Sequence, residues 1–302
     1  MADIFIAARA HESESLETPE ERIQQRSPRT TGETLLCMRQ QLEHFYARRD
    51  SRAIFLRAYY IMTTEVRAAI HGEGDYQQPI FFDGEWVDEV AARFSRLYFS
   101  SLKAPACEAW KRAHALAGEA HSSVIENLML GINAHINYDL AFGIHALLRE
   151  GGEYLNPERL ARRRFDHDQI NNILMRCIPK IQTVLAREFG GGIRIFSDLF
   201  GKLDELLTFT GLRSYRDRVW HNVLALLSAR TSEERHKVEK RLDWESLQIA
   251  EVISQGSALN RMVWRVDGRL RDWRYKAPLL EQERAGGIRA QRASHHLLQR
   301  PF

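Results

Sequence analysis

The feature that most constrains this chain is one long apolar segment, residues 124–148, with polar side chains inside it. A helix needs roughly 20 apolar residues to cross a bilayer, so length alone would permit a membrane span. Charged groups at that depth are costly unless they are paired, and this argues against one. The polar residues of the segment are Glu126, Asn127, Asn133, His135, Asn137, Asp139 and His145. We therefore expect a helix surrounded by other helices, and no membrane span.

Helical spacing and cap signals recur on both sides of this segment and predict an all-α fold. Thr30 to Glu33 and Thr231 to Glu234 have the capping-box pattern, and Asn156 precedes a first-turn proline. Alternating β-branched runs are missing, so we expect a single multi-helix globular array of roughly nine to eleven helices. The expected helices cover residues 53–70, 86–102, 124–148, 167–189, 195–209 and 212–227, and others begin near residues 30, 105, 156, 231 and 243.

The two ends of the chain lack an apolar face. Residues 8–29 are polar and without sustained periodicity, and the chain after residue 279 is rich in Arg and Gln. We predict a flexible N-terminal arm over residues 1–29, a helical domain over residues 30–278 and a flexible tail over residues 279–302.

Charge and cysteine usage exclude several classes of function. The 43 Lys and Arg residues nearly balance the 40 Asp and Glu residues, so we expect no nucleic-acid partner. Cys37, Cys107 and Cys177 are far apart, which predicts neither a disulfide framework nor a thiolate zinc site. The first residues, MADIFIAARAHESES, contain too short an apolar run for a signal peptide. A cytoplasmic location is the expectation.

Chemistry is expected in the stretch GINAHINYDLAFGIH. His135 and Asp139 are four residues apart and share a helix face, while Asn133 and Asn137 share another face about 200° away. An imidazole buried with a carboxylate has a shifted pKa, as working sites often do. We predict that His135 and Asp139 form an acid-base pair and that the asparagines orient a polar group of a substrate. The alternative is a hydrogen-bonded strut that holds helices together.

The same residues carry a resemblance to a known family. The pattern GxNAHINxDL, preceded by FLRAYYIMTTEV and followed by RDRVWHNVLALL, resembles the helical family called domain of unknown function 5995 over residues 35–227. The resemblance implies an α-helical fold and a preserved quartet of Asn133, His135, Asn137 and Asp139. It implies no established activity.

A shorter similarity concerns metal binding. His135, Asp139 and His145 have the H-x3-D-x5-H spacing that is similar to the helical zinc-dependent phospholipase C and single-strand nuclease class, where such residues bind zinc. The chain lacks the N-terminal Trp amine and a clear second His-x3-Asp pair of that class. His167-Asp168 matches only the dipeptide of a metal-binding HD pair. Zinc or another divalent metal at the three residues is therefore the alternative to a site without a cofactor.

The leading hypothesis is a small-molecule enzyme with an apolar pocket between helices. His135 and Asp139 would perform proton transfer, cyclisation or hydrolysis, for example as a biosynthetic tailoring step, on a small apolar or amphipathic molecule. Tyr59, Glu65 and His221 are further candidates for substrate binding in the same cavity. The alternatives are a zinc-dependent hydrolase of phosphoester or related substrates and a non-catalytic binder of an apolar ligand.

Overall fold

A computed structural model describes residues 27–119, 122–189 and 209–264 of the chain. Every regular element in this part is helical, which confirms the all-α prediction. In chain order the elements are α2 (Thr31–Arg48), α3 (Arg52–His71), α4 (Gly84–Ser101), α5 (Glu108–Ala117), α6 (Val124–Asn133), the π-helical turn η1 (Ala134–Asp139), α7 (Leu140–Glu150), the 3-10 turn η2 (Glu153–Leu155), α8 (Pro157–Phe189), α10 (Phe209–Ser228) and α11 (Ser232–Trp264).

Within the described residues, the number of helices is slightly lower than predicted. Because α6, η1 and α7 follow one another without a break, the described ranges contain eight α-helices when these are counted as one. The predicted helix start at Asp243 was wrong: α11 runs through it, and its carboxylate accepts the Glu108 backbone N–H of α5 at 2.8 Å. The helices expected near residue 156 and over residues 167–189 form one element, α8, which continues through Pro179. The helix predicted over 195–209 lies almost wholly outside the described residues, as do most of the arm and the whole tail.

Local side-chain chemistry explains several of the helix ends. The Thr30 hydroxyl accepts the Glu33 N–H at 3.2 Å, and the Asn156 side-chain oxygen accepts the N–H of Glu158 at 3.0 Å. Thr231 and Glu234 form a complete capping box, since the hydroxyl accepts one N–H and the carboxylate accepts the other. Capping satisfies backbone donors that a helix leaves unpaired at its N-terminus.

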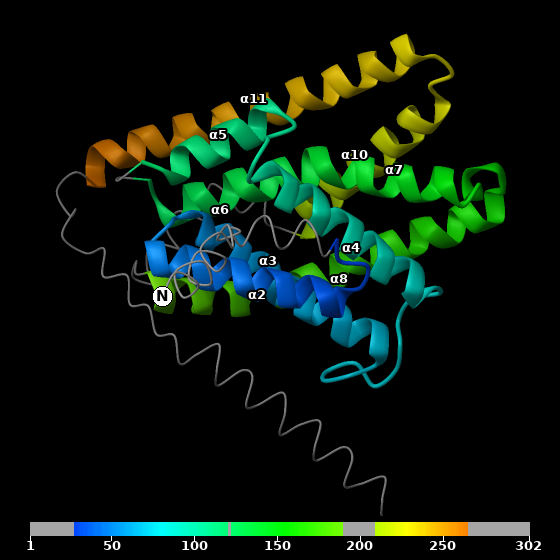
Figure 1. Cartoon of the computed structure of the whole chain (residues 1–302), viewed down its shortest axis with the longest axis horizontal. Coiled ribbons are helices and arrows are strands. Elements are labelled where there is room, and N and C mark those ends of the chain that lie inside the picture. The colour runs from blue at the N-terminus through cyan, green and yellow to red at the C-terminus, as the bar shows by residue number, and fades with distance from the viewer. Residues whose placement is uncertain (1–26, 120–121, 190–208, 265–302) are drawn as a thin grey trace, which may run out of the picture.

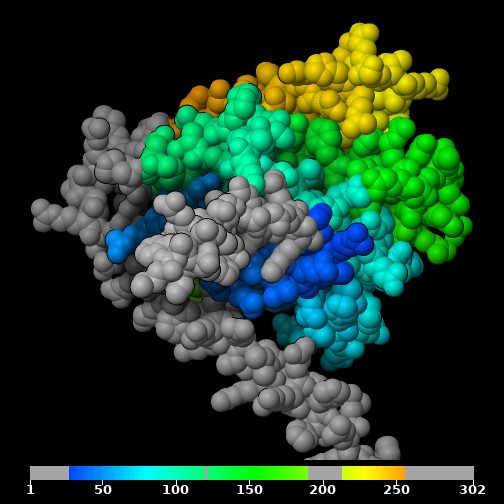
Figure 2. Space-filling model, viewed as in Figure 1, coloured from blue at the N-terminus to red at the C-terminus, as the bar shows by residue number. Residues whose placement is uncertain are grey.

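The continuous α6–η1–α7 helix occupies the centre of the array (Figure 1). It packs against α3, α4, α5, α10 and α11, so the apolar segment is enclosed by protein, as its composition predicted. In the space-filling view α11 runs along the upper edge of the molecule above α5 (Figure 2). None of the helices in the described ranges is both long and apolar enough to cross a membrane.

Buried apolar side chains form two clusters along this central helix. The first lies mainly between α2, α3, α5 and α6, and the second mainly between α7, α8 and α10. Phe94 of α4 and Tyr138 of η1 pack against both. The boundary between the clusters therefore falls at η1, the turn that contains the His135 and Asp139 motif.

Candidate functional site

The motif of the central helix adopts a π-helical turn rather than α-helix. The backbone N–H of Leu140 bonds to the carbonyl of His135, one residue further back than in an α-helix. Isolated π-turns within α-helices are often found at functional sites. His135 and Asp139 still share a face, and the distance from His135 Nδ1 to Asp139 Oδ2 is 3.1 Å.

Trp110 of α5 completes a buried chain of hydrogen bonds. Its indole N–H donates to the same Asp139 oxygen at 2.8 Å, and all three residues are at most 3% exposed. We assign the His135 tautomer in which Nδ1–H donates to Asp139, because a carboxylate oxygen is an acceptor. Nε2 then keeps its lone pair. It is buried and has no hydrogen-bond partner in the described part of the protein.

Desolvation dominates the electrostatics of this pair. Burial lowers the pKa of His135 well below its usual value, so its imidazole is neutral at pH 7 and Nε2 is a proton acceptor. Burial also raises the pKa of Asp139, while the hydrogen bond from Trp110 opposes this shift. The two shifts oppose a doubly charged pair, so burial outweighs the mutual stabilisation of charges that the spacing had suggested. With the imidazole neutral, the Asp139 carboxylate accepts from Trp110 and from Nδ1–H.

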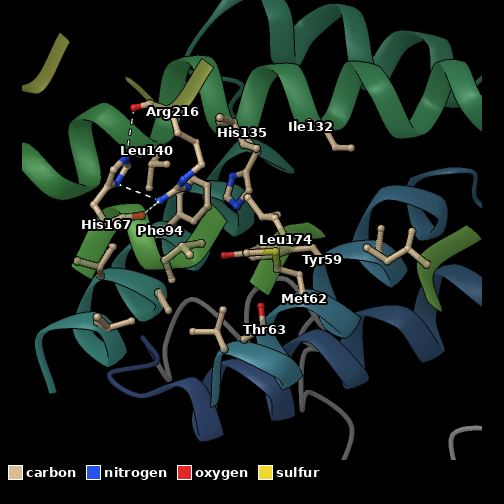
Figure 3. A pocket seen from close by; sticks show the side chains of 18 of the residues that line it. Tyr59, Met62, Thr63, Phe94, Ile132, His135, Leu140, His167, Leu174 and Arg216 are labelled. Carbon is tan, nitrogen blue, oxygen red and sulfur yellow. Dashed lines mark hydrogen bonds between the residues drawn. The ribbon is translucent and has the colours of Figure 1, made fainter. Parts of the chain in front are cut away.

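Aromatic rings hold the His135 imidazole in place. Phe94 stacks on it with the two ring planes 7° apart, and Tyr59 meets it edge-on with ring centroids 4.4 Å apart. The Tyr59 hydroxyl is buried without a partner in the described residues, and burial raises its pKa, so it keeps its proton. Figure 3 shows this hydroxyl beside the His135 ring. Two residues that each have an unpaired polar group thus contact each other through their rings.

Both residues line a cavity of about 160 Å³ between α3, α4, the central helix, α8 and α10. Its walls are mainly aliphatic and aromatic, with polar groups at a few points. A cavity of roughly this size with apolar walls holds a molecule such as benzene. Residues labelled in Figure 3 represent each wall: Tyr59, Met62, Thr63, Phe94, Ile132, His135, Leu140, His167, Leu174 and Arg216.

The asparagine pair lies elsewhere. Asn133 donates its side-chain N–H to the Ser246 carbonyl of α11 at 2.8 Å, and Asn137 donates to the Asn133 side chain at 2.9 Å. Neither asparagine is among the residues that line the cavity. The structure therefore separates the two pairs: His135 lines the cavity with Asp139 behind it, and the asparagines connect the central helix to α11.

The remaining candidates are also dispersed. Tyr59 lines the cavity, but Glu65 pairs with Lys180 at 2.8 Å and the exposed His221 bonds to the Asp217 carbonyl of its own helix. His145 is buried on α7 outside the cavity walls. In the ranges that the structure describes, no three His, Cys, Asp or Glu side chains are grouped so that they could hold a metal ion, so His135, Asp139 and His145 do not form such a cluster.

Several residues of the site were not predicted from the sequence. Trp110 and Phe94 come from α5 and α4, and each looks like one more apolar residue of an amphipathic helix. His167 and Arg216 meet across α8 and α10, where Arg216 donates to the His167 carbonyl at 2.6 Å. An arginine among other charged residues is usually exposed, so spacing carries no signal for its burial.

Comparison with known proteins gives one match. A family model described as "Family of unknown function (DUF5995)" matches residues 32–256, which include the whole central helix. This confirms the resemblance inferred from the motif and extends it at both ends. No curated protein and no solved structure matches the chain.

Proposed function

Because this chain belongs to the DUF5995 family, whose function is unknown, we propose its function from the cavity: it is an enzyme that performs acid-base chemistry on a small, largely apolar molecule. One observation carries the proposal. His135 Nε2 is buried in a cavity wall without a partner, while Nδ1 is held by Asp139 and Asp139 by Trp110. A polar group of a bound molecule would supply the missing partner.

The argument rests on the cost of unpaired polar atoms. A buried acceptor without a hydrogen bond costs roughly 1–3 kcal/mol, so most buried polar groups in proteins are paired. An unpaired Nε2 alone does not mark a site, because His145 also has one outside the cavity walls. What distinguishes His135 is its position in the cavity wall. Here only one nitrogen is bonded, and the unbonded groups of His135 and Tyr59 belong to residues that line the same cavity.

The arrangement suits proton transfer. Nε2 takes a proton from the substrate, and the imidazole becomes positively charged. Asp139 stabilises that charge through the hydrogen bond to Nδ1. This matters because a buried imidazolium without a partner would be costly. The Tyr59 hydroxyl, which keeps its proton, donates to oxygen on which negative charge develops. Isomerisation, cyclisation and hydrolysis of a small molecule each begin with such a step.

A binding protein for an apolar ligand is the second candidate. Aromatic rings enclose the neutral His135, which is also the environment of a packing histidine, and the cavity walls are mainly apolar. In that case a ligand would be retained without being converted. The zinc hydrolase hypothesis has no corresponding support from the grouping of side chains in the described ranges.

We also propose a cytoplasmic protein with no nucleic-acid partner. None of Cys37, Cys107 and Cys177 forms a disulfide, as in proteins of reducing compartments. The near balance of charge supports the second point.

The test is to incubate the protein with a metabolite extract and to follow by mass spectrometry which molecules are consumed and formed. Wild type should convert at least one molecule, and His135→Gln should not. His145→Gln is the matched control, because His145 is a buried histidine of the same long helix with an unpaired Nε2 outside the cavity walls. Retention of a molecule without conversion would favour the binding protein, and equal conversion by His135→Gln would contradict the role of His135.

A further inference from the structure

A second polar region of the cavity wall is formed by Arg216 of α10 and His167 of α8. Arg216 Nη2 donates to the His167 carbonyl at 2.6 Å and lies 3.1 Å from His167 Nδ1. His167 Nε2 lies 3.2 Å from the Arg216 carbonyl. A guanidinium only donates, so Nδ1 accepts and Nε2–H donates to that carbonyl. His167 is thus a neutral support that holds one end of the guanidinium (Figure 3).

The positive charge of Arg216 lacks a hydrogen-bonded carboxylate among the described residues. The side chain is 5% exposed, and its Nε is buried without a partner. The nearby acids Asp168 and Asp217 both pair with Arg164. Leaving a buried charge without a direct counterion is costly, and burial lowers the pKa of Arg216 to about 9.

The one carboxylate among the described cavity residues has another role. Both oxygens of Asp166 accept backbone N–H groups, from Phe82 at 2.7 Å and from Asp83 at 3.1 Å. Asp166 therefore holds the loop before α4. The cavity combines apolar walls, a neutral His135 and one fixed cation whose Nε donor is unused.

We propose that the cavity binds a small organic monocarboxylate, with its carboxylate on Arg216 and its apolar body between α3, α4 and α8. A guanidinium matches a carboxylate in both charge and hydrogen-bond geometry. The size of the cavity fits one aromatic ring or a chain of roughly six carbons. This inference uses the cavity of the proposed function and names its class of substrate, but binding at Arg216 does not depend on catalysis by His135.

The test compares acids with their uncharged analogues. Binding of hexanoate and phenylacetate, and of the primary amide of each, is measured by calorimetry and by the shift in melting temperature. Wild type should bind the carboxylates at least about tenfold more tightly than the amides. Arg216→Gln should abolish this preference, and Arg216→Lys should retain part of it because the charge remains.

Two further variants locate the effect. Leu174→Trp fills the cavity from α8, so it should weaken the binding of acid and amide alike. His135→Gln should keep the preference for acids, even though the proposed function predicts that it loses turnover. If His135→Gln loses turnover but wild type shows no preference for acids, the Arg216 proposal is overturned while the proposed function stands.

Three other results would also overturn the proposal. They are equal affinity of wild type for acid and amide, an acid preference that survives Arg216→Gln, and no binding of either acid at millimolar concentration. If Arg216→Gln does not fold, the comparison of acid with amide in wild type still decides.

Discussion

At the scale of single residues, the site depends on which nitrogen of His135 carries the proton. Asp139 accepts from both Trp110 and His135, and this double acceptance is what leaves Nε2 as a base. Asp139, as an acceptor at Nδ1, therefore determines that the other nitrogen, Nε2, is the base.

Asp139→Asn tests the role of the negative charge. Because Trp110 and His135 both donate to Oδ2, the new amide oxygen takes that position and accepts from both, so the Nδ1–H tautomer is kept while the charge that stabilises the imidazolium is lost. We expect turnover to fall by at least about 100-fold, with a melting temperature close to wild type. The nitrogen chemical shifts of His135 report the tautomer directly, and they need no substrate. The tautomer should stay Nδ1–H, and turnover close to that of wild type would contradict this account.

His145 predicts how stability depends on pH. Burial lowers its pKa from 6.5 to about 4, and Arg235 and Arg149 add to the shift while Glu239 opposes it. Between these pH values the unfolded chain binds a proton that the folded protein does not. The stability from neutral His145 is therefore complete above pH 6.5 and is lost as the pH falls to about 4.

This loss is up to ~3 kcal/mol of unfolding free energy. Denaturant unfolding at a series of pH values should show it, and His145→Gln should reduce the slope between pH 6.5 and 4 while leaving stability at pH 7.5 nearly unchanged. A variant whose pH profile matched that of wild type would show that His145 does not control this slope.

At the scale of elements, the cavity depends on how closely α6 approaches α3. A Cβ placed on Gly131 of α6 would lie within 2.7 Å of three side-chain atoms of Phe55, a residue of the cavity wall on α3. Such distances are far below normal contact. Glycine is therefore needed at this position for the packing of the two helices.

Gly131→Ala should destabilise the protein by about 1–3 kcal/mol, because Phe55 or the helix must move. Displacement of Phe55 should also weaken ligand binding in the cavity. Gly143→Ala on α7 is the matched control: its Cβ would have only ordinary contacts, at 3.8 Å or more, and alanine favours helix by about 1 kcal/mol. Chemical denaturation measures both, and equal effects would argue against the close approach at Gly131.

At the scale of the whole molecule, one buried carboxylate joins three helices. Glu188 of α8 accepts from Arg57 of α3 at 3.0 Å and from the Tyr46 hydroxyl of α2 at 2.6 Å. Arg57 is 1% exposed and Glu188 is 6% exposed. This ion pair holds α8, which forms one wall of the cavity, against α2 and α3.

Glu188→Ala should lower the free energy of unfolding by about 3–5 kcal/mol, because it leaves the Arg57 charge buried without its carboxylate. The double variant Arg57→Met with Glu188→Leu should recover most of that loss, since an apolar pair carries no desolvation penalty. Urea unfolding of the three proteins measures both effects. If the double variant is as unstable as Glu188→Ala, the unpaired charge of Arg57 is not the cause of the lost stability, and this account is wrong.

Much of the fold could be predicted from the sequence, because its signals are local. The capping residues Thr30, Asn156 and Thr231 act on N–H groups within a few positions, and helical spacing is a property of one segment. Asp243 shows where local reasoning fails. Its carboxylate resembles a cap of its own helix, but it accepts an N–H of α5, more than a hundred positions away along the chain.

For the candidate site, too, the sequence predicts the contacts within one helix but not those between helices. The pairing of His135 with Asp139 follows from spacing within one helix, and so does the bond between Asn133 and Asn137. Which of these side chains reaches a cavity depends on the neighbouring helices, and of the four only His135 lines it. Asn133 donates a hydrogen bond to the Ser246 carbonyl of α11, whereas the rings of Tyr59 and Phe94 pack against His135.

The sequence by itself determined an all-helical protein with a polar, buried central helix, because caps and periodicity act over a few residues. Only the tertiary structure decided that His135 has an unpaired nitrogen, that Trp110 supports Asp139 and that Arg216 is a buried cation without a bonded carboxylate. Each of these facts concerns a hydrogen bond made or missing between helices. Such bonds depend on how separate helices pack, which no spacing within one helix encodes.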